Sequence, residues 1–501
     1  MGGPEGRTET EVGTTTQARH EVAWAGQWRA LRRTTGRQRR ALGSSWVGFF
    51  VDMVDIYLPV IALAPAIAYF QPETLGAGEA GTLFFVTFAA TLLGRPVGAL
   101  VFGHLADTLG RRRVTIASIA GFSVCTILIG LLPGHADWGL AAPAALIGLR
   151  FLDGVFLGGE YTAATPLAFE HCPPRARGLF GGLLMSAYAA AYAAVSALVL
   201  VLLLLLPAGA YQAWGWRVPF LAGGLAGLVF LLWRTRVPES PLWQAAVASR
   251  QGYEGCGDAG GDPQASPRQA PVQVLLSGAS RRDFVQVLVL MVGLWLVATS
   301  VVSVLPQRLL AHVGQSPVWV TTVLLAAQPV VIGGFVAAGM TSQKVGRRRA
   351  LALGATVSGT AGLACYVLAL TLPVAGWLLA VLVVATEVTT LAVWGVVTSY
   401  LNERFATNVR ATGFGMAYSL ALVPASFYAF YLTGLTRLMP ERLTQLVLLG
   451  VGSLMALAGA GWGPETRDVD LARAGSPLAI DAPADVTSSD VAPGAPLRQD
   501  Q

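Results

Sequence analysis

The sequence predicts an all-α membrane protein with twelve transmembrane helices, arranged as two related bundles of six. Three observations support this fold class: few charged residues, a series of long apolar segments, and a loop motif that occurs twice. Of the 501 residues, 54% are hydrophobic and only 12% are charged, whereas a soluble domain carries about 25% charged residues. Apolar segments of about 20 residues, each long enough to cross a bilayer as a helix, recur along the chain. A soluble protein has no core large enough to bury them.

The apolar segments and the breaks between them predict the domain organisation. Six helices are expected in the first half, at 46–70, 80–104, 113–133, 140–169, 178–206 and 215–235, and six in the second, at 284–306, 317–341, 349–372, 375–401, 411–435 and 441–463. The chain is thereby divided into an N-terminal tail (1–45), a first bundle (46–235), a linker (236–283), a second bundle (284–463) and a disordered C-terminal tail (464–501). The linker is assigned from its Gly, Pro and polar residues, and the tails from their low content of apolar residues.

The basic residues are divided very unevenly between the two sides of the predicted bundle. Of 34 basic residues, 28 fall on the side shared by both termini. Four fall on the opposite side (Arg217, Arg308, Arg437 and Arg442), and Arg95 and Arg150 fall inside predicted helices. Because positive charge favours the cytoplasm, we expect both termini to be cytoplasmic and the chain to lie in the plasma (inner) membrane. The net charge of +6 therefore indicates topology and not nucleic-acid binding.

One loop motif occurs in each half, between its second and third helices. The first copy is Gly98, Gly103, Asp107, Gly110, Arg111, Arg112 and Arg113, and the second copy is Gly334, Gly339, Gln343, Gly346, Arg347, Arg348 and Arg349, with every position displaced by one constant interval. A second pair, Glu170–Arg177 and Glu403–Arg410, and a third, Pro238–Ser240 and Pro464–Thr466, follow at slightly shorter intervals. Three ordered matches indicate a duplication, which is a common plan among transporters that hold a solute between their two halves.

The residue types in these loops predict conformational gating. Glycines permit close helix packing, and arginines stay at the membrane surface, where they bind carboxylates or helix C-termini. We expect Asp107 to pair with Arg111 or with basic residues of a neighbouring loop and so to latch one conformation. In the second copy Gln343 replaces the acid, so we expect that copy to keep only close packing and a topology anchor. If the arginines are only topology anchors, neither copy forms a latch.

These motifs carry a resemblance to a known family. Over residues 45–465 the chain resembles the major facilitator superfamily, and within it the metabolite:proton symporter group. The supporting stretches are Arg95–Gly98 running into Phe102–Asp107, Gly158–Tyr161, Glu170–Gly178, Gly215–Phe220 and Pro238–Pro241. The group usually has a Glu-x-x-Asp pair in its first helix, where this chain has Asp52-Met-Val-Asp55. An Asp-x-x-Asp pair is also similar to the aromatic-acid and sialate symporter groups. The resemblance implies the major facilitator fold.

Ionisable residues inside predicted helices are the candidate functional groups, because each costs a few kcal/mol at the membrane centre. Counted along each helix at its regular rise per residue, Asp55, Arg150 and Glu387 fall at similar depths near the midplane. Asp52 lies one turn from Asp55 on the same helix face. A carboxylate whose pKa is raised by burial and lowered by a nearby Arg can act as a proton switch. We therefore expect four residues to take part in proton coupling: Asp52, Asp55, Arg150 and Asp153.

The resemblance also associates acids of the first helix and an Arg of the fourth with coupling and with substrate recognition. Candidates for substrate binding are Arg150, Glu387, Tyr57, Tyr188, Trp295, Gln307, Gln328 and Trp394. Two alternatives stay open here. Arg150 and Asp153 are three residues apart and can form a purely structural ion pair. Glu387 can bind a cation, carry a proton, or pair with a polar neighbour.

The remaining features exclude other classes of protein. There is no Walker loop, no zinc motif and no nucleophile motif, and the four cysteines show no CxxC spacing. We therefore expect no enzyme activity, no cofactor and no metal. The prediction is a secondary transporter, driven by a proton gradient, that imports a small organic acid and works as a monomer in the lipid bilayer. Proton-coupled efflux of a drug or metabolite, and solute sensing without transport, are the alternatives.

Overall fold

The computed structural model describes residues 24–71, 77–207, 209–237, 239, 244, 271–306, 309, 313–373, 376–407 and 409–471. These residues are almost entirely helical, and twelve of the helices are long and apolar enough to cross a membrane. The predicted fold class is therefore confirmed. Large apolar side chains, among them Leu204, Leu205, Leu232 and Phe430, are exposed on the outside of the bundle, as expected for a surface that faces lipid.

The first half comprises α3 (Gly36–Tyr57) continued by η1 (Leu58–Leu63), α4 (Ala77–Leu109), α5 (Arg111–Leu131), α7 (Ala141–His171), α8 (Arg177–Leu205) and α9 (Arg217–Arg234). The second half comprises α12 (Gly278–Thr299) continued by η5 (Ser300–Val304), α14 (Pro317–Val345), α15 (Arg347–Val357) with η6 (Ser358–Gly362) and α16 (Leu363–Thr371), α17 (Gly376–Leu391) with α18 (Trp394–Arg404), α19 (Arg410–Leu420) with α20 (Leu422–Ser426) and α21 (Tyr428–Leu435), and α22 (Thr444–Trp462). Short elements are α2 (Trp24–Arg32), η2 (Ala64–Phe70), α6 (His135–Trp138), η3 (Pro174–Ala176), η4 (Tyr211–Gly215), α11 (Pro271–Leu275) and η7 (Glu441–Leu443).

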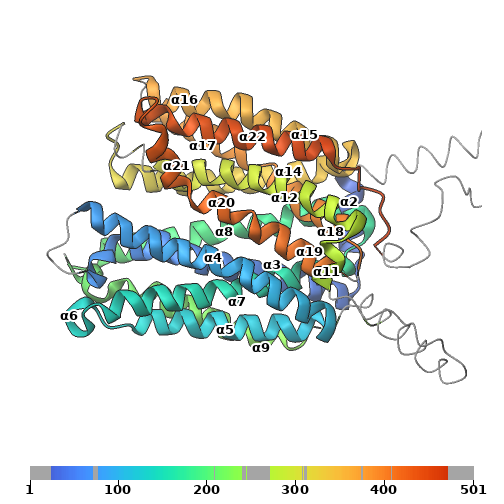
Figure 1. The fold of residues 1–501 in the computed structure, drawn as a ribbon, viewed down its shortest axis with the longest axis horizontal. Helices are drawn as coiled ribbons and strands as arrows, with labels where there is room; N and C mark the ends of the chain where they lie inside the picture. The colour runs from blue at the N-terminus through green and yellow to red at the C-terminus, as the bar shows by residue number, and fades with distance from the viewer. Residues whose placement is uncertain are drawn as a thin grey trace, which may run out of the picture.

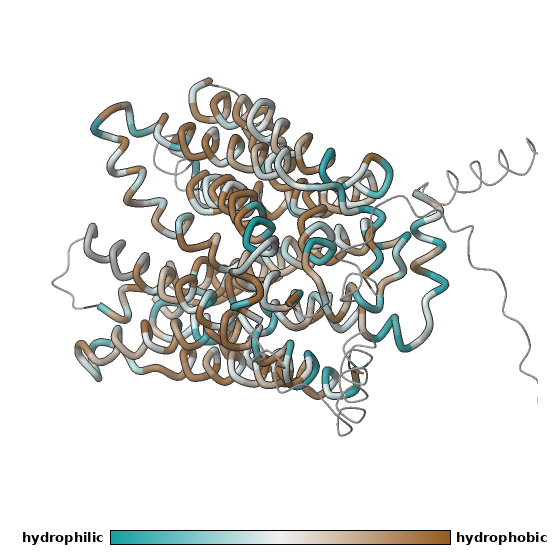
Figure 2. Tube along the Cα trace, turned by 45° about the vertical axis from the view of Figure 1, so that its right-hand side comes forward, coloured by the Kyte–Doolittle hydropathy of each residue, from teal (hydrophilic) through white to brown (hydrophobic). Residues whose placement is uncertain are grey.

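The two halves lie side by side with their helix axes roughly along one direction (Figure 1). Both loop motifs lie at the same end of the bundle, which we call the arginine-rich end and define by residues 104–113, 170–178, 340–349 and 403–412. Helix α2 and residues 464–471, the described parts nearest the two termini, also lie at this end (Figure 1). Long apolar stretches of the trace alternate with polar turns (Figure 2).

The three largest differences from the predicted boundaries lie at the start of α3, at the start of α12 and at the beginning of the C-terminal tail. Helix α3 begins at Gly36, well before the expected start at 46, because Thr35 and Gln38 form a capping box there that satisfies free backbone donors. Helix α12 begins at Gly278, inside the expected linker 236–283. The first residues of the expected disordered tail, 464–471, pack on the arginine-rich end, where Leu471 is buried. The rest of that tail, most of the linker and residues 1–23 lie outside the described residues.

Glycines hold α4 and α7 in direct backbone contact. A Cβ atom at Gly98 would lie 1.9 Å from the carbonyl oxygen of Val155, and one at Gly154 would lie 2.1 Å from that of Thr91. Real Cβ atoms essentially never approach other atoms so closely. The motif glycine Gly98 is therefore required for helix packing, which fixes the rotation of α4 and α7 and hence the side chains they direct inward.

We expect Gly98→Ala to destabilise the protein by about 1–3 kcal/mol or more, the usual effect of overpacking, because the clash is with backbone and not with a flexible side chain. The measurement is the melting temperature of the purified protein in detergent. Gly148→Ala is the matched control, since Gly148 lies on α7 and has nothing within 4 Å of its added Cβ. Equal melting temperatures for the two variants would contradict this account of α4–α7 packing.

Candidate functional site

The two copies of the loop motif build the same structure. Gly110 and Gly346 have φ angles of 104° and 99°, a conformation that favours glycine, and each precedes the first residue of a helix. In the first half, Glu239 accepts a hydrogen bond from the Arg112 N–H (3.0 Å). In the second, Glu465 accepts one from the Arg347 N–H (2.7 Å). Glu239 thus caps the positive N-terminal end of α5, and Glu465 caps that of α15. Both glutamates belong to the third repeated pair, Pro238–Ser240 and Pro464–Thr466, so this pair has a structural role.

Buried ion pairs cross the arginine-rich end. The Glu170 carboxylate accepts hydrogen bonds from Arg111 of its own half and from Arg410 of the other half. Glu403 binds Arg347 with two hydrogen bonds of 3.1 Å each. All these side chains are fully buried. Charge-assisted bonds of this kind are strong, so Glu170 joins the two halves.

The acceptor at the third motif position binds the start of a helix in the opposite half. Asp107 accepts from the Thr412 N–H (3.0 Å) and hydroxyl (2.8 Å) at the start of α19, and lies 3.7 Å from Arg111. Gln343 accepts from the Gly178 N–H (3.0 Å) at the start of α8, and also from Arg347 (2.7 Å). The expectation that the second copy keeps only packing and a topology anchor is therefore wrong. An amide oxygen accepts the same hydrogen bond as a carboxylate, so only the negative charge is lost.

The other predicted gating residues lie around these bonds. Arg177 donates to the Val469 carbonyl (2.8 Å) and accepts from Ser399 at its own carbonyl (2.9 Å). Gly103 and Gly339 let the halves touch, because added Cβ atoms would lie 3.1 Å from Thr412 and 2.4 Å from the Gly178 carbonyl. Arg113 is exposed, as expected for a topology anchor. The arginine-rich end is thus closed in this conformation.

Cys172 lies in this closed end, in the turn between α7 and η3, and is buried. Burial raises the pKa of its thiol to about 12. The thiolate is the reactive form, so very little of the reactive form is present between pH 7 and 8.

We expect maleimide to label Cys172 at least about tenfold more slowly than an exposed cysteine between pH 7 and 8. The measurement uses a variant that retains only Cys172, with Cys125, Cys256 and Cys365 replaced by serine. The control carries Arg175→Cys in a background without Cys172, because residue 175 is exposed in the same loop. Equal rates would show that this end does not stay closed.

A layer of aromatic rings also joins the halves. The ring of Tyr161 on α7 lies 4.3 Å from that of Tyr418 and 5.1 Å from that of Phe414, both on α19. Phe49 on α3 packs on the other side of Tyr161 (5.0 Å). Offset and tilted rings at these distances attract one another beyond their burial of apolar area. The rings supplement the ion pairs in closing the arginine-rich end.

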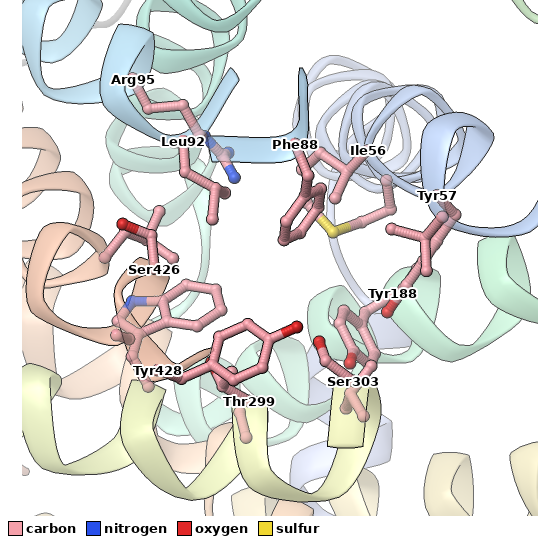
Figure 3. A pocket seen from close by; sticks show the side chains of 17 residues that line it. Ile56, Tyr57, Phe88, Leu92, Arg95, Tyr188, Thr299, Ser303, Ser426 and Tyr428 are labelled. Atoms are coloured by element: carbon pink, nitrogen blue, oxygen red, sulfur yellow. The ribbon is translucent and has the colours of Figure 1, made fainter. Parts of the chain in front are cut away.

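A hollow lies between the halves. Its empty space, open solvent included, is about 710 Å³. Tyr57 and Tyr188, both predicted candidates, line it together with Phe88 and Tyr428 (Figure 3). Trp295, a third predicted candidate, is also part of the wall.

The charged residue of this wall is Arg95, whose guanidinium is directed into the hollow (Figure 3). Arg95 lies 3.4 Å from Asp52, and both side chains are buried. Arg95 was predicted to lie inside a helix but not in the site; its position next to Pro96 within a membrane span was the available signal. Either Asp55 or Asp52 was expected to face Arg150; the structure places Asp55 beside Arg150 and pairs Asp52 with Arg95.

Asp55, Arg150 and Asp153 come together as predicted. Arg150 lies 3.4 Å from Asp55 and 3.0 Å from Asp153, and the Thr126 hydroxyl donates a hydrogen bond to Asp55. We call Asp55, Arg150 and Asp153 the triad. The Arg150 guanidinium has two carboxyl groups around it and no exposure to solvent. Arg150 does not line the hollow, so the triad lies behind the wall.

Two further buried charges extend this network. Glu160 on α7 is buried among Asp52, Arg234 and Arg95, and packs against Gly48. Arg234 donates hydrogen bonds to Ser44 (2.8 Å) and Thr115 (3.5 Å). Neither residue was predicted to belong to the site, because both fall near the predicted membrane surface. Glu160 adds one acidic group and Arg234 one basic group to the first half.

The second half holds a buried acid on α17. Glu387 on α17 is 4% exposed and accepts a hydrogen bond from Gln328 (3.2 Å), so Gln328 is its polar neighbour. Trp394 packs against Trp295 (4.6 Å) next to the hollow. Gln307 lies outside the described residues.

The fold and the site together define an integral membrane transporter with two six-helix halves around a central hollow. Residues 60–475 match the family Sugar (and other) transporter. The chain therefore belongs to this family, within the major facilitator superfamily, and is not an enzyme, as predicted. Its relatives and its twelve spans place it in the inner membrane.

Known proteins agree with this assignment. A putative metabolite transport protein of Haemophilus influenzae is 26% identical over 442 residues, which are 85% of this chain and 96% of that protein. The inner membrane metabolite transport protein YhjE of Escherichia coli is 33% identical over 218 residues. The matched region is 43% of this chain and 49% of YhjE, so this chain spans about half the length of YhjE. The proton:xylose symporter XylE bound to 6-bromo-6-deoxy-D-glucose shares the fold, with a TM-score of 0.71 and 17% identity over 87% of this chain and 98% of XylE.

Proposed function

We propose that this protein is a proton-coupled symporter that imports a small organic solute bearing a carboxylate, by alternating access. The observation that carries the proposal is the buried charge network of the first half. It contains four carboxyl groups (Asp52, Asp55, Asp153 and Glu160) and three guanidinium groups (Arg95, Arg150 and Arg234), all at most 3% exposed.

One proton neutralises this network. Asp52 pairs with Arg95, and the charged neighbours of Glu160 are Asp52, Arg234 and Arg95. The triad has two carboxyl groups for one guanidinium. Uncompensated charge in a low-dielectric interior is expensive, so the triad holds a proton whenever the network is neutral. This assigns proton coupling to Asp55 and Asp153, with Arg150 between them.

The solute carboxylate binds at Arg95, the basic group of the hollow. Asp52 and Asp55 are one helical turn apart, about 5–6 Å between their Cβ atoms, so Arg95 and the triad influence each other electrostatically. A deprotonated triad repels an anionic group at Arg95, and a protonated triad does not. The coupling is reciprocal, so proton and solute bind together and leave together. The sequence suggested Arg150 as the residue that binds the solute carboxylate. In this proposal that residue is Arg95.

The arginine-rich end faces the cytoplasm in this proposal, because 28 of the 34 basic residues belong to that side and positive charge is retained there. The ion pairs of Glu170 and the bonds of Asp107 and Gln343 then close the inner side. Solute and proton reach the hollow from outside, and opening of the arginine-rich end releases both into the cell.

Uptake into proteoliposomes tests the proposal. A panel of radiolabelled carboxylates and zwitterions is offered with and without a pH gradient that is alkaline inside. We expect accumulation of at least one solute only when the gradient is present. Uptake that ignores the gradient would refute symport, gradient-driven expulsion would indicate efflux, and binding without any flux would indicate a sensor.

A further inference from the structure

Helix α2 precedes the first half in the chain and packs on the arginine-rich end (Figure 1). The buried Gln27 side chain donates a hydrogen bond to the carbonyl of Met340 on α14 (3.0 Å), and the ammonium group of Lys344 lies 5.3 Å from the centre of the Trp24 ring. Both partners belong to the second half. Because α2 also contacts η3 and α8 of the first half, it connects the two halves at their closed end.

The other faces of α2 have the composition of a helix at a membrane surface. Trp24, Trp28 and Leu31 are spaced four and three residues apart, so they share one face, and the two tryptophans are 46% and 38% exposed. Arg29 and Arg32 lie on the adjoining face and are exposed. Tryptophan and arginine are the residues that hold an amphipathic helix where lipid headgroups meet acyl chains.

The basic residues of this region are concentrated and have no acidic neighbours in the sequence. Six of the 34 basic residues lie between positions 29 and 40, and no acidic residue occurs from 24 to 51. Within the ranges that the structure describes, none of these six arginines forms an ion pair. A polybasic segment next to a membrane span attracts anionic lipids. Retention of positive charge on one side of the membrane would also explain such a segment, but the groove beside it indicates a specific site.

The groove lies between α2, α3 and α8, and its empty space, open solvent included, is about 900 Å³. Among the described residues that line it, the charged ones are Arg32 and Arg39. Its wall is otherwise mainly apolar and includes Trp28, Trp46, Phe180 and Leu183. The Trp46 indole N–H donates a hydrogen bond to the Ser186 hydroxyl (3.0 Å), which holds this ring in the wall. Trp46, Phe180 and Leu183 belong to candidate membrane spans, so the apolar wall lies on helices that enter the bilayer.

We propose that this groove binds an anionic phospholipid from the leaflet at the arginine-rich end, with the headgroup phosphate at Arg32 and Arg39 and an acyl chain along the apolar wall. A guanidinium binds phosphate oxygens through two N–H groups at once. A free phosphate would leave the apolar wall in water, whereas a lipid covers it.

The charge of the segment favours an anionic lipid over a zwitterionic one. Phosphatidylcholine also carries a phosphate, but its ammonium group would lie among arginines, with no acid from 24 to 51 to receive it. The bound lipid has a consequence for the conformation of the protein. Because α2 contacts both halves, a lipid held between α2 and α3 stabilises the closed form of the arginine-rich end.

Native mass spectrometry of the full-length protein tests the site. The protein is equilibrated with equal amounts of dioleoyl phosphatidylglycerol and dioleoyl phosphatidylcholine, which have the same acyl chains and differ in headgroup charge. We expect the first retained lipid to be phosphatidylglycerol at least about tenfold more often. Glycerol 3-phosphate, which has the phosphate without the chains, should not displace it at equal concentration. Equal retention of the two lipids, or displacement by glycerol 3-phosphate, would overturn the proposal.

Variants without the groove charges locate the site. In the double variant Arg32→Gln/Arg39→Gln the preference for phosphatidylglycerol should be lost, and the fold should be kept because both side chains are exposed. The matched control is Arg281→Gln/Arg282→Gln, which removes two exposed arginines at the start of α12, the first helix of the second half. The control should keep the preference. An equal loss in the two double variants would indicate general attraction by surface charge and overturn a site in the groove.

Maleimide labelling of Cys172 in lipid nanodiscs measures the effect on the closed end, with the variant that retains only this cysteine. Adding phosphatidylglycerol to phosphatidylcholine should slow labelling severalfold, and Arg32→Gln/Arg39→Gln should remove the slowing. An anionic surface also lowers the local pH and with it the thiolate fraction. The exposed cysteine of Arg175→Cys reports that general effect. Equal slowing at both cysteines would overturn the stabilisation of the closed end, while the lipid preference seen by mass spectrometry would still support the site.

Discussion

Replacement of Asp55 by asparagine is expected to abolish proton-driven accumulation while substrate exchange partly survives. Asparagine resembles the protonated acid in shape and charge, so the triad becomes permanently neutral and Arg95 can still bind the solute. The proton no longer has to be released before the empty carrier returns, and the gradient is uncoupled from transport.

The expected effect is large. With one proton per solute, a gradient of one pH unit supports about tenfold accumulation, since about 1.4 kcal/mol corresponds to a factor of ten. In Asp55→Asn the accumulation ratio should fall to about one, while counterflow of labelled solute against unlabelled solute continues. Asp137→Asn is the control, because Asp137 is exposed in α6. Undiminished accumulation in Asp55→Asn would remove Asp55 from the coupling mechanism.

Replacement of Glu170 by glutamine is expected to open the arginine-rich end. The uncharged side chain leaves Arg111 and Arg410 close together without the carboxylate that both contact. Loss of one partner from a buried, hydrogen-bonded charge pair costs about 2 kcal/mol or more. The ratio of open to closed forms should then rise by roughly thirtyfold or more.

Maleimide labelling of Cys172 measures this opening, because the thiol lies in the same closed end. We expect labelling to accelerate at least tenfold in Glu170→Gln relative to the parent that retains only Cys172, and transport to slow because the closed conformation is less populated. Glu441→Gln serves as the control, with an exposed acid in η7. If labelling stays slow in Glu170→Gln, the bonds of Asp107 and Gln343 suffice to hold the halves together.

The number of helices, the duplication and the depth of the charged residues in the membrane were predictable from the sequence. They depend only on the lengths of the apolar segments and on the spacing of residues along the chain. Asp55 and Arg150 were expected at one level because the rise of a helix per residue is constant, and the structure brings them within 3.4 Å. Arg150 and Asp153 were expected to pair from their spacing of three residues, and they do.

Helix rotation was not predictable in the same way. The pairing of Asp52 with Arg95 depends on how α3 and α4 are turned about their axes, which the glycine contacts of α4 with α7 determine. The role of Gln343 was missed because the comparison of the two motif copies considered charge and not hydrogen bonding. The docking of residues 464–471 uses backbone carbonyls, such as those of Val469 and Leu471, which every residue type carries.

The capping glutamates Glu239 and Glu465 have a consequence for the independence of the two halves. Each follows the last helix of its half and binds the start of the third helix of that same half. The last and third helices of each half are therefore joined by a contact within that half. The two halves are therefore complete modules, and a protein cut between them, with both pieces made in one cell, should reassemble from its fragments. Each Pro-Glu-Ser or Pro-Glu-Thr sequence then marks the boundary of the ancestral unit that was duplicated.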